Sequence, residues 1–179
     1  MILFSVTGVL AHSEYKAGQK IEIGEYTGTI IDESDLPKGI QPIYIENIKE
    51  VEGVVKKLES GLFSVNDSKL IKSDMESKAY GYQTKRMSVV SGLYVKAYYT
   101  YASNPIRFGS CTNVVSYLSG QPFADWTQTS YSGSVIDSGR SLAVNFSGFL
   151  DVYITTPFGL LKVSTTHHDL YTEFYYTAI

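Results

Sequence analysis

From Val89 to the end of the chain, apolar and polar side chains alternate with a period of two, and Gly, Ser and Asn residues interrupt the alternation at short intervals. Successive side chains of a strand point to opposite faces, so this period indicates a sheet with one buried face. Short strands separated by turn residues are typical of antiparallel sheets. The sequence therefore predicts that residues 89–179 form an antiparallel β-sandwich domain.

The predicted strands of this domain follow one another closely. One face of the clearest strand carries Leu93, Val95, Ala97, Tyr99 and Tyr101, and the other carries Tyr94, Lys96, Tyr98 and Thr100. Asp and Gly tolerate the tight conformations of a hairpin turn, so Asp137-Ser138-Gly139 is predicted to connect strands at 134–136 and 141–146. The later strands are predicted at 149–155, 160–166 and 171–176.

Residues 14–88 have a different composition, because most of the charged side chains precede residue 89. Between Ile45 and Leu62 apolar residues recur at steps of three and four, which predicts an amphipathic helix. Lys20–Ile31 predicts a short strand or hairpin, and the polar segment Ser64–Arg86 is predicted to be an exposed connection. We therefore expect an N-terminal strand and helix appended to the sandwich.

The chain begins with an apolar run from Ile2 to Ala11. Its length suits the apolar region of a signal peptide and falls short of the ~20 residues that span a bilayer. Small residues at Ala11 and Ser13 predict cleavage before Glu14. No Lys or Arg precedes the run, so the alternatives are a signal peptide with a truncated start and a buried first strand. We expect residues 1–13 to be a signal peptide and the protein to be secreted or held at the cell envelope, without a transmembrane segment.

Two segments of the second part carry a resemblance to known proteins. They are the Tyr-rich YVKAYYTY at 94–101 and WTQTSYSGSVIDSGRSLAVNFSGFL at 126–150, in which a tryptophan strand, a Ser-Gly turn and a Ser-Gly strand end follow in order. In this pattern the second part resembles small exported bacterial proteins of unknown function. The resemblance implies a β-sandwich and export, and it implies no activity.

The adjacent histidines His167 and His168 are the first candidates for a site. In a regular strand they point to opposite faces, so they do not both face one metal ion. His167 shares a face with Asp169, Tyr171 and Glu173, but a zinc site needs three or four protein ligands of suitable type. We therefore predict an ordinary strand face here, with no metal and no cofactor.

The stretch CTNVVS from Cys111 to Ser116 indicates a different chemistry. It is similar to the nucleophile segment of papain-like bacterial cell-wall amidases and peptidases, and the resemblance implies a Cys111 thiolate at a helix N-terminus. The remaining catalytic residues would be His167 or His168 as the base and Asp169 or Asn145 as the orienting group. Ser110 replaces the usual acidic residue, and the residues after Cys111 are weak helix formers. A buried or half-buried strand cysteine is the competing interpretation.

Charge limits the choice of partner. The chain has 15 Lys and Arg against 18 Asp and Glu, for a formal charge of −3. It contains no basic cluster of the kind that neutralises nucleic-acid phosphates. We therefore expect no nucleic-acid partner.

The fifteen tyrosines outnumber the candidate catalytic residues. Tyrosine combines a rigid apolar ring with a polar tip, which suits protein surfaces and stacking on carbohydrates. The leading hypothesis is a non-enzymatic binding protein with a protein or carbohydrate ligand. The candidate contact residues are Tyr98, Tyr101, Trp126 and Tyr131. The alternatives are tyrosines that only fill the core, the cysteine-dependent enzyme, and a membrane-active secreted toxin.

Overall fold

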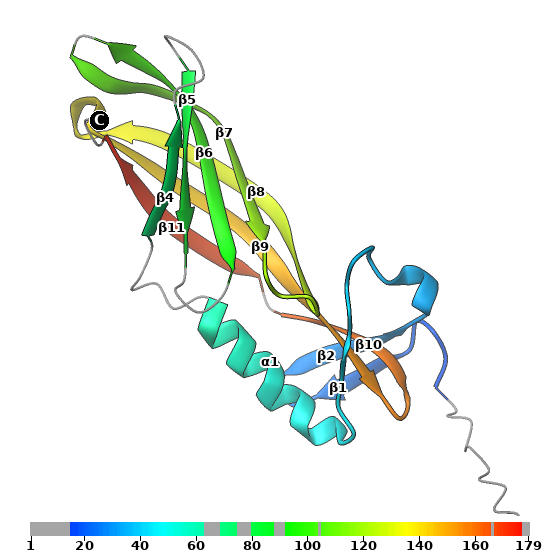
Figure 1. Cartoon of the computed structure of the whole chain (residues 1–179). Coiled ribbons are helices and arrows are strands. Elements are labelled where there is room, and N and C mark those ends of the chain that lie inside the picture. The colour runs from blue at the N-terminus through cyan, green and yellow to red at the C-terminus, as the bar shows by residue number, and fades with distance from the viewer. Residues whose placement is uncertain are drawn as a thin grey trace, which may run out of the picture.

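The computed structural model describes residues 15–62, 69–74, 80–87, 92–103, 105–165 and 167–176. Within these ranges the chain forms two sheets of mostly antiparallel strands and the helix α1 (Figure 1). The predicted fold class, mainly β with an N-terminal strand and helix, is confirmed. The predicted signal peptide, residues 1–13, lies outside the described residues.

The larger sheet, sheet A, is built around one long strand, β9 (Ser141–Thr156). The first half of β9 pairs with β11 (His168–Tyr175), and its end pairs with β10 (Gly159–Ser164). β8 (Ala124–Ile136) pairs along the opposite side of β9. Because β9 takes part in all three pairings, it connects the two ends of the molecule (Figure 1).

The hairpin predicted around Asp137 is confirmed. The short 3-10 turn η3 (Asp137–Gly139) joins β8 to β9. All three of its residues have positive φ, at 51° for Asp137, 56° for Ser138 and 89° for Gly139. These are conformations that Asp and Gly adopt more easily than most residues, which is why the turn forms here.

The N-terminal strands extend sheet A at its other end. β2 (Tyr26–Ile31) pairs with β10, and β1 (Lys20–Ile23) pairs with β2. β3 (Ile43–Tyr44) adds a short parallel pair to the end of β9. The strand or hairpin predicted at Lys20–Ile31 is therefore confirmed, and its partner β10 comes from the far end of the sequence.

The smaller sheet, sheet B, covers the part of sheet A formed by β8, β9 and β11 (Figure 1). Its strands in order are β4 (Lys69–Asp74), β5 (Tyr80–Arg86), β6 (Leu93–Ser103) and β7 (Ile106–Leu118). The alternation predicted for β6 is confirmed. The buried residues between the sheets include Leu93, Val95, Ala97 and Tyr99 from β6, and Leu142, Val144, Phe146 and Leu150 from β9.

Two strands of sheet B lie in the segment that was predicted to be an exposed connection. That prediction is wrong for β5, because Gln83 and Lys85 are buried. Gln83 Nε2 donates to the Tyr175 carbonyl at 3.2 Å, and Lys85 Nζ donates to the Glu173 carbonyl. Both polar side chains therefore bond the edge of β11 in the other sheet. Burial lowers the pKa of the Lys85 ammonium.

The opposite seam between the sheets is closed in the same way. Gln128 of β8 accepts hydrogen bonds from the Ser116 backbone N–H at 2.5 Å and the Ser116 hydroxyl at 2.7 Å. Its side-chain amide donates to the Val114 carbonyl at 3.0 Å. One amide thus occupies part of the edge of β7 in the manner of a neighbouring strand, which protects an otherwise open sheet edge.

Helix α1 (Ile48–Leu62) lies beside β1 and β2 at the end of the molecule away from sheet B (Figure 1). It begins three residues later than the apolar spacing indicated, because Asn47 is its N-cap and accepts a hydrogen bond from the Lys49 N–H at 3.1 Å. Val51 and Val55 are fully buried, which confirms the amphipathic pattern. This end of the protein is therefore packed against sheet A.

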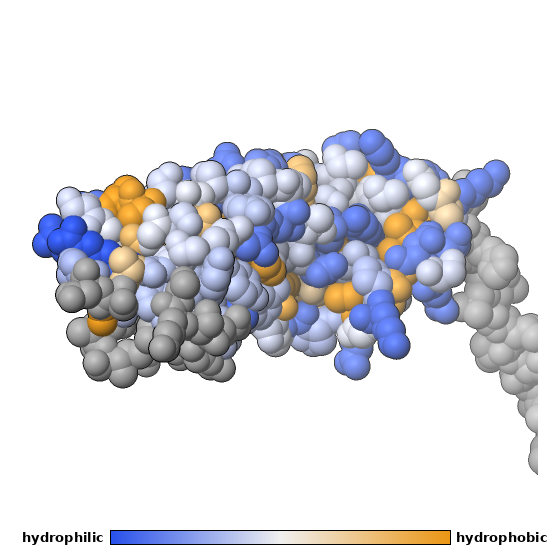
Figure 2. Space-filling model, turned by 90° about the horizontal axis from the view of Figure 1, so that it is seen from above, coloured by the Kyte–Doolittle hydropathy of each residue, from blue (hydrophilic) through white to orange (hydrophobic). Residues whose placement is uncertain are grey.

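The molecule is elongated, and Figure 2 shows that hydrophobic residues on the side drawn there lie in small separate groups among polar ones. In the part of the chain that the structure describes, no helix is long and apolar enough to cross a bilayer.

Candidate functional site

The four predicted contact residues do not form one surface. Tyr98 lies on the outer face of sheet B, and Tyr131 on β8 is 48% exposed. Tyr101 is half-buried and packs against the core. Trp126 is buried, and its indole N–H donates to the Ser116 hydroxyl at 2.8 Å. The ring of Trp126 is thus part of the seam between the sheets, which corrects its prediction as a contact residue.

Cys111 lies in strand β7, where the amidase resemblance implied the start of a helix. Its thiol is half-buried and points at Asn113 O, 3.8 Å away. Burial raises the pKa of this thiol, so the site holds it in the neutral form, whereas a cysteine nucleophile needs the thiolate. The interpretation as a strand cysteine is the one that the structure supports.

Cys111 and the histidines lie at different levels of the sandwich. The Cys111 side chain lies against Gly133, which pairs with Val144 of β9. His168 pairs with Gly148, four residues further along β9 and thus ~13 Å away by strand rise. The set of Cys111, His167 and Asp169 implied by the amidase resemblance is therefore not assembled.

His167 and Asp169 lie together at the start of β11, as predicted. His167 Nδ1 is 3.6 Å from Asp169 Oδ1, and His167 Nε2 is 3.1 Å from the Thr129 hydroxyl. Asp169 also accepts a hydrogen bond from the Ser147 hydroxyl at 2.6 Å. Among the described residues, no three His, Cys, Asp or Glu side chains gather closely enough to hold a metal ion.

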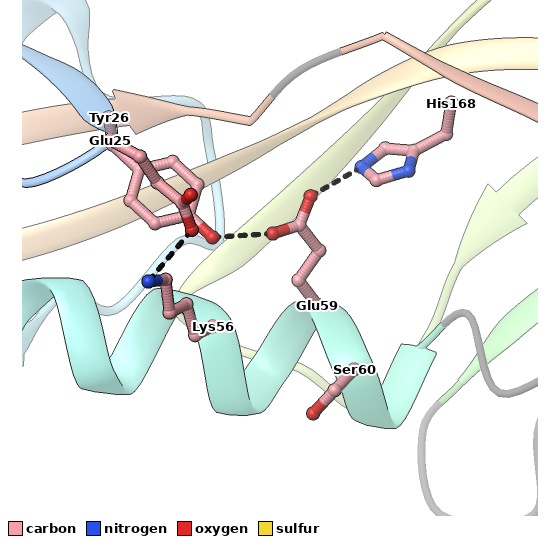
Figure 3. A pocket seen from close by; sticks show the side chains of 6 residues that line it. All are labelled: Glu25, Tyr26, Lys56, Glu59, Ser60 and His168. Carbon is pink, nitrogen blue, oxygen red and sulfur yellow. Dashed lines mark hydrogen bonds and ion pairs between the residues drawn. The ribbon is translucent and has the colours of Figure 1, made fainter.

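His168 points to the opposite side and enters an open hollow of about 410 Å³ between α1 and sheet A. Figure 3 shows that three elements meet there at the Glu59 carboxylate of α1. His168 Nε2 of β11 lies 2.9 Å from Glu59 Oε1, and the Tyr26 hydroxyl of β2 donates to Glu59 Oε2 at 2.6 Å. On the same side of the helix, Lys56 Nζ lies 2.9 Å from the Glu25 carboxylate.

The electrostatics of the hollow follow from burial. Burial lowers the pKa of the His168 imidazole, and the Glu59 carboxylate only partly opposes this effect. Burial and the hydrogen bond to Glu59 both raise the pKa of the Tyr26 phenol. The polar groups of the hollow therefore bind one another, and we interpret the hollow as the joint that holds α1 on the sheet.

The outer face of β8, β9 and β11 carries mostly polar side chains, and Ser141, Ala143 and Ser147 on the central strand are buried. The strand registers place the residues in four rows across the sheet, and we call this array the serine–tyrosine face. The rows are Ser130, Ser147 and Asp169; Ser132, Asn145 and Tyr171; Ser134, Ala143 and Glu173; and Ile136, Ser141 and Tyr175. Neighbouring strands are ~4.8 Å apart and alternate residues of one strand ~6.7 Å apart, so the array repeats regularly in both directions.

Two tyrosine rings stand out on this face. Tyr171 is 49% exposed and Tyr175 is 54% exposed, and both lie on β11 on either side of Glu173. The Tyr171 hydroxyl donates to Glu173 Oε1 at 2.5 Å, and the Tyr175 hydroxyl donates to Glu173 Oε2 at 2.7 Å. Since both phenol tips are tied to one carboxylate, the rings lean along the strand towards each other while much of their surface stays in solvent.

These hydrogen bonds also set the protonation states of Glu173, Tyr171 and Tyr175. The two phenol donors hold the pKa of the Glu173 carboxyl below its ordinary value. The Glu173 carboxylate in turn raises the pKa of Tyr171 to about 12. At neutral pH the arrangement is therefore one carboxylate held between two neutral phenols.

The tyrosines on the outer face of sheet B are arranged differently. The rings of Tyr94 and Tyr117 stack on each other, with centroids 5.3 Å apart and planes 8° apart. Lys96 Nζ lies 3.7 Å from the ring centroid of Tyr82 and 4.5 Å from that of Tyr98. The ring faces of these tyrosines are thus in contact with their own neighbours.

Sequence reasoning placed Tyr171, Glu173 and Asp169 on one face but did not select Tyr171 or Tyr175 as contact residues. Extending the alternation by one step, from 173 to 175, would have found the pair of rings. No comparable signal marks Glu59, because its partners Tyr26 and His168 are distant in the sequence.

Comparisons of the chain with protein-family models, with curated proteins and with solved structures found no match.

Proposed function

We propose that the protein is a non-enzymatic binding module that holds a carbohydrate on the serine–tyrosine face. The observation that carries this proposal is the pair of half-exposed rings, Tyr171 and Tyr175, fixed by hydrogen bonds to Glu173 on a sheet face that also carries serine hydroxyls.

The rings supply the apolar part of such a site. A sugar ring has apolar C–H faces that pack on an aromatic ring, and the phenol leaves a polar tip for hydrogen bonding. Because both tips are already held by Glu173, Tyr171 and Tyr175 lose little side-chain entropy on binding. The rings are thus ordered before a ligand arrives.

The neighbouring strands supply the polar part. Exposed Asn145 lies beside Tyr171 and presents an amide, which offers both a donor and an acceptor. Exposed Ser132 and Ser134 on β8 present hydroxyls that act in either sense. Sugar hydroxyls also donate and accept, so a face that offers all these groups beside aromatic rings complements a glycan chain.

Other parts of the molecule are poorer candidates for a binding site. The hollow at α1 is occupied by groups that bind one another, and Cys111 is held as a thiol in a strand. The rings of sheet B pack on each other. Export to the envelope or the medium is a further part of the proposal, and it rests on the sequence of residues 1–13.

The test is affinity electrophoresis of the full chain in native gels that contain soluble polysaccharides of neutral, amino and acidic types. We expect at least one of them to retard the wild-type protein. The double variant Tyr171→Ala/Tyr175→Ala should bind roughly ten- to a hundredfold more weakly, since each ring contributes up to ~1.5 kcal/mol beyond its area.

Tyr80→Ala is the matched control, because Tyr80 is 55% exposed, as Tyr175 is at 54%, but lies in sheet B. It should be retarded like the wild type. The proposal is wrong if no polysaccharide retards the wild type, or if the double variant is retarded as strongly as the Tyr80→Ala protein. A melting curve for each variant separates loss of binding from loss of folding.

A further inference from the structure

We propose that the glycan bound by the serine–tyrosine face carries free amino groups, as a polysaccharide of amino sugars does. This inference rests on the proposed carbohydrate binding and adds the chemical class of the ligand.

The charge of the serine–tyrosine face is negative. Of its twelve residues, the two that carry a charge are Asp169 and Glu173, and both are acidic. The Asp169 side chain is 80% exposed, so its carboxylate is open to a ligand. The face therefore complements a ligand with positive groups and disfavours a ligand with negative ones.

The negative charge of Glu173 lies at the centre of the aromatic pair. Glu173 lies between the two tyrosines, and each of its oxygens accepts one phenol hydrogen bond. A carboxylate oxygen has a second lone pair, so each can still accept a hydrogen bond from an ammonium group. An ammonium group placed there also lies beside the Tyr171 ring, which attracts cations through its π face, whereas the Tyr175 ring already has the Lys85 ammonium 5.4 Å from its centroid. A sugar packed on Tyr171 or Tyr175 brings its own amino group to this point.

The other side of the sandwich differs in charge. On the outer face of sheet B the charged residues of β5 and β6 are Arg86 and Lys96, both basic, and they lie among the tyrosines of these strands. A polycationic glycan is repelled there and attracted on the serine–tyrosine face. The sign of the charge thus selects one of the two tyrosine-bearing faces.

The test compares two oligosaccharides that differ only in acetylation, the hexamer of glucosamine and the hexamer of N-acetylglucosamine, by titration calorimetry with the full chain at low salt and pH 6. We expect the glucosamine hexamer to bind roughly tenfold more tightly, because its ammonium groups add charge-assisted contacts. Added salt should reduce this preference.

Two variants assign the preference to the two carboxylates. Asp169→Asn and Glu173→Gln should each reduce the preference several-fold, and Asp169→Asn does so without touching the tyrosine rings. Glu50→Gln is the control, since Glu50 is an exposed acid on α1, away from the face.

Three outcomes would overturn the inference. Equal affinity for the two hexamers, or binding to neither, would exclude an amino-sugar ligand. The electrophoresis in polysaccharide gels would still test carbohydrate binding independently. A preference that survives both variants places the cation site elsewhere. A hexalysine peptide that binds as tightly as the glucosamine hexamer, and equally to Tyr171→Ala/Tyr175→Ala, would mean a surface for basic peptides.

Discussion

At the scale of single residues, the Cys111 thiol shows how a local environment limits chemistry. Burial raises its pKa, so at pH 7 to 8 less thiolate is present than in a free cysteine with a pKa of ~8.5. We expect a thiol reagent to label the native protein much more slowly than the unfolded protein across this range. Rapid labelling of the native protein well below pH ~8.5 would contradict this and would revive the nucleophile hypothesis.

The same cysteine makes Gly133 necessary. A Cβ at Gly133 would lie 2.3 Å from Cys111 Sγ and 2.6 Å from Cys111 Cβ, so Gly133→Ala should destabilise the protein by ~1–3 kcal/mol in urea unfolding. Cys111→Gly should recover most of this loss. Gly148→Ala is the control, because its Cβ would meet the Thr127 carbonyl oxygen at 2.4 Å, which Cys111→Gly leaves in place. Equal rescue of both alanine variants would show that the overlap with Cys111 is not the cause.

At the scale of elements, the sheets are held together by side chains that bond the strand edges. Gln128→Ala leaves the Ser116 N–H and the Val114 carbonyl without their partner at a half-buried seam. We expect a loss of ~1–3 kcal/mol in the free energy of unfolding, the cost of leaving such groups unpaired. Thr127→Ala, at an exposed position on the same strand, should change it by less than ~0.5 kcal/mol. Similar losses in the two variants would mean that Gln128 does not hold the seam.

The elements that were predicted correctly depend on interactions between residues close in the sequence, and the element that was missed depends on residues far apart. The alternation of β6, the turn at Asp137 and the amphipathic face of α1 are local patterns, and all three were predicted correctly. Strand β5 was missed because its buried Gln83 and Lys85 are polar, and the hydrogen bonds of Gln83 Nε2 and Lys85 Nζ go to β11, about ninety residues later. A hydrophobicity pattern does not show a burial that depends on a distant strand edge.

At the scale of the whole molecule, the same limit applies to the candidate site. The face shared by Asp169, Tyr171 and Glu173 follows from strand alternation within one segment, so it was predicted. The rows that add serines and Asn145 depend on the pairing of β11, β9 and β8, which no local pattern specifies. The joint at Glu59 unites β2, α1 and β11, and it too exists only in the folded chain.

That joint makes the stability of the whole protein depend on pH. The pKa of His168 is lower in the folded protein than the 6.5 of a free histidine. Below pH 6.5 this side chain is therefore protonated more readily in the unfolded chain than in the folded one. The free energy of unfolding should therefore fall as the pH drops from 7.5 to 5.5, by up to ~1.4 kcal/mol for each pH unit below 6.5 until the folded pKa is reached. Urea unfolding at several pH values measures this slope.

The neighbouring histidine supplies the control for this dependence. His168→Gln keeps a donor for Glu59 and removes the titration, so the fall in stability between pH 7.5 and 5.5 should become smaller than in the wild type. His167→Gln changes the neighbouring histidine, which lies outside the joint at Glu59, and should reduce this fall in stability less than His168→Gln does. Hydrogen exchange should show the loss first in α1, because Glu59 joins that helix to β2 and β11. An unchanged slope in His168→Gln would mean that other groups make the protein sensitive to acid.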